Sequence, residues 1–153
     1  MTIEQACALD IAEILELQRL AYQSEAILLN NFSIPPLTQT LAEVEIEFQN
    51  GVFLKATDDG RIIGSVRGYG KDSTLFIGKL IVHPDFRGKG IGTSLLTAIE
   101  QLYPACRYEL FTSAKSEKNL RLYERQGYRK FMEKSVSPEL TFIYLEKAPL
   151  AHD

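Results

Sequence analysis

A glycine-rich stretch between an apolar run and a helical pattern is the part of this chain best suited to hold a ligand. It reads Arg87-Gly88-Lys89-Gly90-Ile91-Gly92, follows the strand-like run 74–82, and leads into a helix predicted over 90–103. Glycines let an anion approach main-chain N–H groups closely, and the first turn of a helix presents N–H groups without carbonyl partners at the positive end of its dipole. With Arg87 and Lys89 beside these groups, the stretch predicts a site for a phosphorylated ligand.

Two other kinds of phosphate-binding loop do not match the glycines of this chain. A Walker loop has four residues between its two glycines, followed by Lys and Ser or Thr, whereas Gly64 and Gly70 have five residues between them. A dinucleotide-binding fingerprint has the spacing G-x-G-x-x-G, whereas the glycines at 88, 90 and 92 are separated by single residues. The spacing R-x-x-G-x-G is met instead, by Arg87, Gly90 and Gly92.

This spacing resembles the acetyl-coenzyme A loop of the GCN5-related N-acetyltransferases (GNAT). The whole block 80–92, Leu-Ile-Val-His-Pro-Asp-Phe-Arg-Gly-Lys-Gly-Ile-Gly, is similar to the central motif of that family. Downstream, the block 119–128 resembles its second signature, N-x-x-x-Y-x-x-x-G-[FY]. The two blocks occur in the family's order, within residues 80–128, which make up about a third of the chain.

The residue pattern also predicts the order of helices and strands. Helices are predicted over 11–23, 39–50, 90–103 and 117–126, and strands over 1–5, 52–57, 62–69, 74–82, 107–112, 131–134 and 141–147. The resemblance implies one N-acetyltransferase domain over 1–153 with an α/β (mixed α+β) fold. In that fold a single central mixed, splayed β-sheet is flanked by helices. The splay is expected between the strand that ends at Val82 and the strand 107–112.

Several residues have the chemistry of helix caps or breakers. Asp10, with Glu13 three positions later, predicts a capping box at the start of the first helix. Thr38 and Ser116 are expected to cap two later helices, and Gly127 to follow the end of one. Pro35-Pro36 is expected to break the chain.

Coenzyme A has two parts that this chain could bind. Its pyrophosphate suits the N–H groups of 88–93, and its pantetheine amides could pair with the edge of the strand that ends in Leu80-Ile81-Val82. The family resemblance adds coenzyme contacts from Asn119 and Tyr123, which lie four positions apart and so share one helix face. The predicted acetyl-CoA contacts are Leu80, Ile81, Val82, Arg87, Gly88, Lys89, Gly90, Ile91, Gly92, Thr93, Asn119 and Tyr123.

The resemblance makes Tyr123 the candidate catalytic acid, because the tyrosine of the second signature sits near the coenzyme sulfur. A phenol with a pKa near 10 is a weaker acid than a thiol with a pKa near 8.5, so full proton transfer is uphill by roughly 2 kcal/mol. A hydrogen bond from Tyr123 to the leaving thiolate would then suffice, unless the site lowers the pKa of the phenol. The alternative is that Tyr123 is only a core aromatic whose hydroxyl has another partner.

The general base is not evident from the sequence. Many family members carry Glu where this chain has Gly78, so the usual carboxylate is missing. Glu109, His83 and Glu25 are the candidates to replace it, and loss of the proton to water is another route. Main-chain N–H groups near Ile81 or Val82 are expected to stabilise the oxyanion of the transition state.

The charge of the first fifty residues bears on the acceptor. This part holds eight acids and one base, Arg19, whereas the rest of the chain has more bases than acids. In the family the first two helices cover the acceptor site. An acidic cover would attract a cationic amine such as a polyamine, an aminoglycoside or a lysine-containing peptide, unless these acids merely solvate two amphipathic helices. Tyr22 and Glu25, together with Glu109, are the predicted acceptor contacts.

Bulk properties set the remaining expectations. A chain of 153 residues with 45% hydrophobic residues suits one soluble domain, and no apolar run is long enough for a membrane helix. Without an export signal at residues 1–5, a cytoplasmic protein is expected. Cys7 and Cys106 lack metal-ligand spacing, so no metal is expected, and no basic stripe indicates nucleic acid. The closing strands could pair between two copies as a homodimer. A catalytically idle coenzyme-binding or regulatory module is the alternative to an enzyme.

Overall fold

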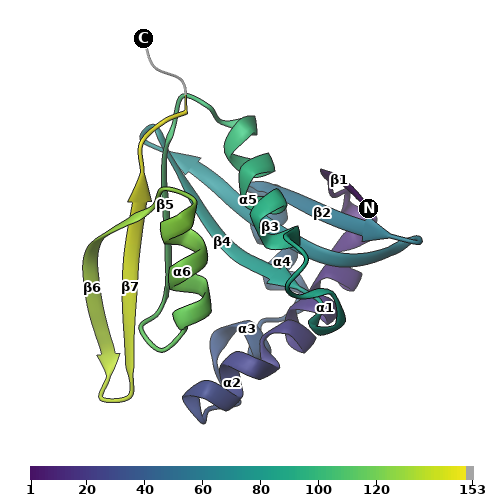
Figure 1. The fold of residues 1–153 in the computed structure, drawn as a ribbon. Coiled ribbons are helices and arrows are strands. Elements are labelled where there is room, and N and C mark those ends of the chain that lie inside the picture. The colour runs from purple at the N-terminus through teal and green to yellow at the C-terminus, as the bar shows by residue number, and fades with distance from the viewer. Residues whose placement is uncertain (151–153) are drawn as a thin grey trace.

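Seven strands form one mixed sheet in the computed structural model, which describes residues 1–150 (Figure 1). The order across the sheet is β1-β2-β3-β4-β5-β7-β6, and only β4 and β5 run parallel to each other. The strands are β1 Thr2–Gln5, β2 Val52–Asp58, β3 Arg61–Lys71, β4 Thr74–Val82, β5 Arg107–Ser113, β6 Arg129–Ser137 and β7 Leu140–Lys147. The helices are α1 Ile11–Ala21, α2 Gln23–Leu29, α3 Pro35–Thr38, α4 Leu41–Gln49, α5 Ile91–Leu102 and α6 Glu117–Arg125, with 3-10 turns at Ala8–Asp10 and Pro84–Phe86.

The sheet splits between β4 and β5, as the family resemblance implies. These strands pair only at Thr74 with Arg107, Leu75 with Tyr108, and Phe76 with Glu109. Beyond these pairs the two strands diverge, and α6 lies beside the opening (Figure 1). The expected mixed, splayed sheet is therefore confirmed.

A β-bulge in β4 accompanies the split. The pairing of β3 with β4 shifts by one residue between Ser65 opposite Ile81 and Arg67 opposite Gly78. Within the extra stretch, Lys79 has a φ of 50°, in the left-handed region that a lysine rarely adopts. The bulge lies on the segment of β4 that β5 no longer pairs with.

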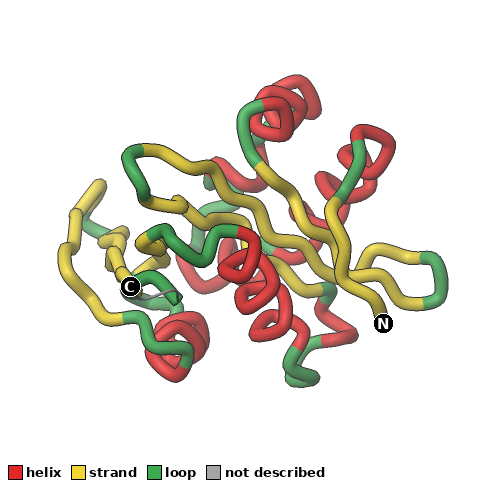
Figure 2. Tube along the Cα trace, turned by 90° about the horizontal axis from the view of Figure 1, so that it is seen from above, coloured by secondary structure: helices red, strands yellow, loops and turns green. Residues whose placement is uncertain are grey.

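Helices cover both faces of the sheet (Figure 2). On one face, Leu95, Leu96 and Ile99 of α5 are fully buried against strand residues such as Tyr108. On the other face, α1 and α4 pack over β2, β3 and β4 in a second apolar cluster that includes Phe53. The predicted apolar stripe of α5 is confirmed, and it holds the glycine-rich loop against the end of β4.

Asp10 is the N-cap residue of α1 as predicted, but the predicted capping box is wrong, because the Asp10 side chain makes no hydrogen bond to the first turn of this helix. Asp10 instead accepts a hydrogen bond from the N–H of Cys7 at 2.8 Å and pairs with Lys55 at 2.9 Å. Glu13 accepts from the N–H of Ile62 on β3 at 2.8 Å. Both acids thus hold the first helix to other elements, because long-range partners were available that the local pattern does not reveal.

The region between the first two predicted helices contains two helices that the sequence pattern did not predict. The first helix ends at Ala21, and α2 and α3 follow as separate elements. Pro35 and Pro36 begin α3 rather than only breaking the chain, because a proline fits the first helical turn. The cap of α4 is Thr40, not Thr38: its hydroxyl accepts from the N–H of Glu43 at 3.2 Å.

The closing hairpin is longer than predicted. β6 extends over Arg129–Ser137, and every residue in it is exposed. β6 pairs with β7 on one side and forms the edge of the sheet on the other. The homodimer expected through these strands stays a prediction. Positions 151–153 of the predicted domain lie outside the described residues.

Candidate active site

The glycine-rich loop has the backbone of an anion site. Gly88 and Gly90 have φ values of 77° and 80°, and a Cβ added to either would meet no atom within 4 Å. These glycines therefore serve backbone conformation and open space rather than tight packing. Within residues 1–150, the N–H groups of 87–93 donate to no main-chain carbonyl. The loop can thus direct several N–H groups, at the start of the twelve-residue helix α5, to one bound anion.

The two basic residues of the loop differ in their contacts. The guanidinium of Arg87 donates to the carbonyl oxygen of Ala21, the last residue of α1, at 2.9 Å. It therefore ties the loop to the negative end of that helix. The Nζ of Lys89 lies 5.2 Å from the ring centroid of Phe86, and Lys89 is exposed.

The edge of β4 offers main-chain groups to a ligand in the splay. No residue of β4 after Phe76 pairs with β5. Of the three predicted contacts on this segment, Leu80 and Val82 pack towards the α5 face, and Ile81 is buried on the α1 face. Their side chains anchor the strand, so its free edge is rigid and available for amide pairing.

Tyr123 is buried at the splay beside two other predicted site residues. Its side chain is 6% exposed, and its hydroxyl makes no hydrogen bond within residues 1–150. Burial raises the pKa of the Tyr123 phenol, and the nearby Tyr22 and Glu25 raise it further. The site therefore does the opposite of lowering this pKa. Tyr123 is suited to donate a hydrogen bond while keeping its proton.

Tyr22 reaches this place from the junction between α1 and α2, and Glu25 reaches it from α2. Burial raises the pKa of Tyr22 to about 12, with opposing effects from Arg67 and Glu25. Glu25 accepts a hydrogen bond from the hydroxyl of Ser116 at 2.5 Å, which links α2 to the start of α6. Ser116 takes the predicted N-cap position of α6, but its hydroxyl bonds to Glu25 instead of capping the helix. The structure brings together residues that lie about a hundred positions apart in the sequence.

Asn119 lies on the same helix as Tyr123 and is half-buried. Its amide donates to the hydroxyl of Thr112 on β5 at 3.3 Å. This contact orients Asn119 towards β5 rather than towards solvent. Gly127, with a φ of 96°, follows the end of the helix as predicted.

The three candidate bases already have partners. Glu109 pairs with Arg107 at 2.9 Å, and Arg107 also pairs with Glu146 at 3.0 Å. The Nδ1 of His83 accepts from the N–H of Asp85 at 3.1 Å. Glu25 is bonded to Ser116. Glu109 also lies at the paired end of the splay, whereas Glu25 lies close enough to Tyr123 to affect its pKa.

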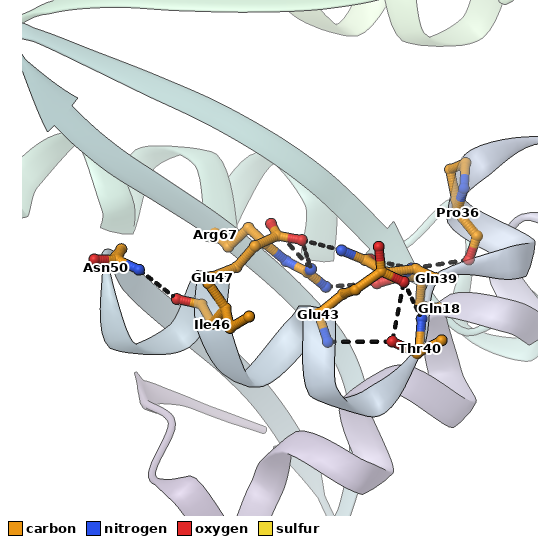
Figure 3. Close-up of polar contacts among 9 residues, drawn as sticks. All are labelled: Gln18, Pro36, Gln39, Thr40, Glu43, Ile46, Glu47, Asn50 and Arg67. Carbon is orange, nitrogen blue, oxygen red and sulfur yellow. Dashed lines mark hydrogen bonds and ion pairs between the residues drawn. The ribbon is translucent and has the colours of Figure 1, made fainter.

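A buried polar network that joins α1, α4 and β3 was not found by sequence reasoning (Figure 3). Arg67 on β3 is 4% exposed, donates to Gln18 at 2.6 Å, and pairs with Glu47 at 3.4 Å. Gln18 also donates to the carbonyl of Pro36 at 2.8 Å and to Gln39 at 2.9 Å. The one available signal was a polar residue in each of two apolar patterns. Gln18 stands on the buried stripe of α1, and Arg67 stands in the buried strand β3.

Most acids of the first fifty residues have structural partners. Six of the eight contact a backbone N–H, a hydroxyl or a basic side chain: Glu4, Asp10, Glu13, Glu25, Glu43 and Glu47. Three of them, Glu4, Asp10 and Glu47, pair with a basic side chain, and the other three bond to neutral groups, which orient the carboxylate without cancelling its charge. A cationic acceptor stays a prediction.

Two features are absent from the described part of the chain. Among residues 1–150, no three His, Cys, Asp or Glu side chains come together in a way that could hold a metal ion. No helix in the same range is long and apolar enough to cross a membrane. The expectations about metals, nucleic acid and cellular location stay predictions.

Comparison with known proteins agrees with the loop and the splay. The model of the Acetyltransferase (GNAT) family matches residues 11–128, well over half of the chain. The protein therefore belongs to the GNAT acetyltransferase family, and the resemblance read from its two motifs is confirmed. Membership supports an acyltransferase activity but identifies no acceptor.

Individual relatives are distant. The UPF0157 protein YqkA of Bacillus subtilis (strain 168) is 29% identical over 119 residues, which are 77% of this chain and 34% of that protein. This chain thus spans about a third of that relative's length.

Solved structures match over almost the whole fold. The ribosomal-protein-S18-alanine N-acetyltransferase from Escherichia coli matches with a TM-score of 0.81 and 14% identity, over 99% of this chain and 95% of its own. The PaiA N-acetyltransferase from Thermoplasma acidophilum, solved in complex with coenzyme A, matches with a TM-score of 0.79 and 16% identity, over 97% and 99%. These likenesses confirm the predicted fold class.

Proposed function

We propose that this protein transfers the acetyl group of acetyl-CoA directly to a primary amine of a small molecule or peptide. One observation carries the proposal. The unpaired N–H groups of 88–93 stand at one end of β4, its free edge continues from them, and Tyr123 is buried at the same splay. This arrangement has a place for a diphosphate, an amide-containing arm and a sulfur, in that order.

The residues present fit acetyl-CoA. The positive φ values of Gly88 and Gly90 leave the loop open to a doubly charged pyrophosphate, with Lys89 exposed beside it. The β4 edge can pair with the pantetheine amides as it would with an added strand. Asn119 and Tyr123 lie on the α6 side of the same opening.

The proposed chemistry needs little from side chains. The amine nitrogen forms a bond to the acetyl carbon, the carbon–sulfur bond breaks, and the sulfur keeps the electron pair. Tyr123 donates a hydrogen bond to that sulfur, and its raised pKa keeps the phenol protonated while it does so. Main-chain N–H groups of the β4 bulge near Ile81 and Val82 stabilise the oxyanion. The proton of the amine leaves through water.

Deprotonating the acceptor is the demanding step. An alkyl amine with a pKa near 10.4 costs about 4–5 kcal/mol to deprotonate at pH 7. Because Glu109, His83 and Glu25 all have partners, attack by the small neutral fraction of the amine is the simplest route. The rate should then rise with pH.

The test combines a binding and a turnover measurement. Acetyl-CoA should raise the melting temperature, and acetyl-CoA together with a suitable amine should release free thiol. Thiol must be measured against a protein-only control, because Cys7 is a free, exposed cysteine. The proposal fails if no amine in a broad panel gives thiol above the rate without amine.

A catalytically idle module is the second candidate, and one observation favours it. Gly78 stands where many family members carry a glutamate, and each side chain considered as a substitute is already engaged. Binding of acetyl-CoA without turnover on any amine would favour a regulatory, coenzyme-sensing role.

A further inference from the structure

Lys79 is a basic residue in the splay for which the fold supplies no partner. Of the three half-buried lysines among residues 1–150, Lys55 and Lys147 each have a carboxylate oxygen within 4.0 Å, whereas Lys79 has none. It is half-buried and sits in the β4 bulge with a φ of 50°. A lysine held in an unfavourable backbone conformation, away from full hydration and without an ion pair, lacks a structural reason within the fold.

The charges around Lys79 leave a net positive excess. Its charged neighbours are Arg67 and Glu47, and Glu47 already pairs with Arg67. The single carboxylate of Glu47 thus lies near two positive charges, those of Arg67 and Lys79. Burial lowers the pKa of Lys79, and the Arg67 guanidinium lowers it further, so a bound anion would relieve a real electrostatic cost.

The position of Lys79 relates it to the reacting end of the site. It lies on β4 beyond Phe76, where the strand edge faces the splay. Tyr22 links the two sides, because it affects the pKa of both Arg67 and Tyr123. Lys79 lies on β4, at one side of the splay, and Tyr123 lies on α6, beside the opening.

We propose that the ammonium group of Lys79 binds a carboxylate of the acceptor, so that the acceptor is an amine that also carries a carboxylate, as a free amino acid does. This rests on the proposed acetyl transfer and narrows its substrate class. Among the acids of the first fifty residues, Glu47 is the one that acts on Lys79 within the described residues, and Glu47 already pairs with Arg67. A carboxylate at Lys79 would form a charge-assisted hydrogen bond in a partly desolvated site.

The experiment uses matched pairs of amines that differ only by the carboxylate. Phenylalanine is compared with phenethylamine, leucine with isoamylamine, and lysine with cadaverine, with spermidine as a polycation. Thiol release gives kcat and KM for the unaltered protein, for Lys79→Gln, which removes the charge, and for Lys79→Arg, which keeps it. The shift in melting temperature with acetyl-CoA is recorded for each protein.

The unaltered protein should use the carboxylate-bearing member of each pair at least tenfold better. Lys79→Gln should lower kcat/KM for these members about 10- to 100-fold, mainly through KM, which is the range for a lost charged hydrogen bond. It should leave the carboxylate-free amines unchanged, and Lys79→Arg should restore part of the preference.

Two results would overturn the assignment. Preference for the carboxylate-free amines or spermidine would show that Lys79 does not select the acceptor. Equal slowing of all amines by Lys79→Gln would give Lys79 a role in chemistry or folding instead. Failure of the proposed function looks different: acetyl-CoA would raise the melting temperature while no amine released thiol.

Discussion

The loop at 88–93 and the proposed acceptor side of the splay are built in different ways. The loop is contiguous in the sequence and offers main-chain N–H groups, whose directions are set by Gly88 and Gly90. The acceptor side is assembled from side chains on α1, α2, β3, β4 and α6, which meet only in the folded chain. A shared coenzyme can be held by a short motif, whereas a particular acceptor requires long-range assembly. If this contrast is right, damage to the loop should abolish binding, and damage to the acceptor side should change rate, stability or selectivity.

The largest effect is expected from Gly90→Glu. The new side chain would bring bulk and negative charge to the predicted pyrophosphate site, so affinity for acetyl-CoA should fall at least 100-fold by calorimetry. Gly60→Glu is a matched control, because Gly60 also has a positive φ, 75°, and also has open space around it in the β2–β3 turn. Retained affinity in Gly90→Glu would show that the loop had been misassigned.

Tyr123→Phe should lower kcat about 10- to 100-fold and leave acetyl-CoA affinity within about threefold, because it removes one hydrogen bond to the leaving sulfur. Tyr69→Phe is the control, since Tyr69 is 51% exposed and lies on β3. Unchanged turnover would remove Tyr123 from the mechanism.

The pH profile tests the same residue in another way. Because the pKa of Tyr123 is raised above its ordinary value near 10, the phenol stays protonated and able to donate at least up to that pH. The kcat/KM should therefore rise with pH as the amine loses its proton, without a fall before about pH 10. A decline between pH 8 and 9 would point to a different acid.

Gln18→Leu should destabilise the protein by about 2–3 kcal/mol, because it leaves the buried Nη2 of Arg67 and the carbonyl of Pro36 without their hydrogen-bond partner, while Glu47 still pairs with the Nη1 of Arg67. Urea unfolding would measure the loss. Gln23→Leu, at an exposed position on α2, should change stability by less than about 0.5 kcal/mol. Equal effects of the two changes would mean that the buried network does not stabilise the acceptor side.

The smallest effect is expected from Ser116→Ala. It removes the hydrogen bond to Glu25 that joins α2 to α6, so KM for the acceptor should rise about two- to fivefold with little change in acetyl-CoA affinity. Ser33→Ala, at an exposed position, should have no effect. A larger change in coenzyme affinity than in acceptor KM would contradict the proposed division between the loop and the acceptor side.

What the sequence could predict follows the same division. The order of helices and strands along the chain and the glycine-rich loop were predictable, because apolar periodicity and glycine spacing are local patterns. The splay was implied only by the family resemblance of the two motifs. The roles of Asp10, Glu13 and Ser116 were mispredicted, because each side chain has a partner far away in the sequence that replaces the expected local cap. The network around Arg67 was missed for the same reason.

Lys79 is a proposed site residue whose role the sequence motif does not reveal. Sequence reasoning noted the glutamate missing at Gly78 but gave no role to the next residue. The pairing of β3 with β4 shifts by one residue between positions 65 and 67 of β3. This bulge makes Lys79 of β4 a neighbour of Arg67 and Glu47. A one-residue irregularity in a strand has no signature in apolar alternation.

The hydrogen bond from Arg87 to the carbonyl of Ala21 connects the glycine-rich loop to the end of α1, and so connects the proposed coenzyme site to the proposed acceptor side. A diphosphate bound in the loop would compete with the Ala21 carbonyl for the guanidinium of Arg87. Ala21 directly precedes Tyr22, one of the predicted acceptor contacts. Binding of acetyl-CoA would then change the contacts at the end of α1 before the amine binds. Product-inhibition kinetics should accordingly show a compulsory sequence, with coenzyme A the last to depart.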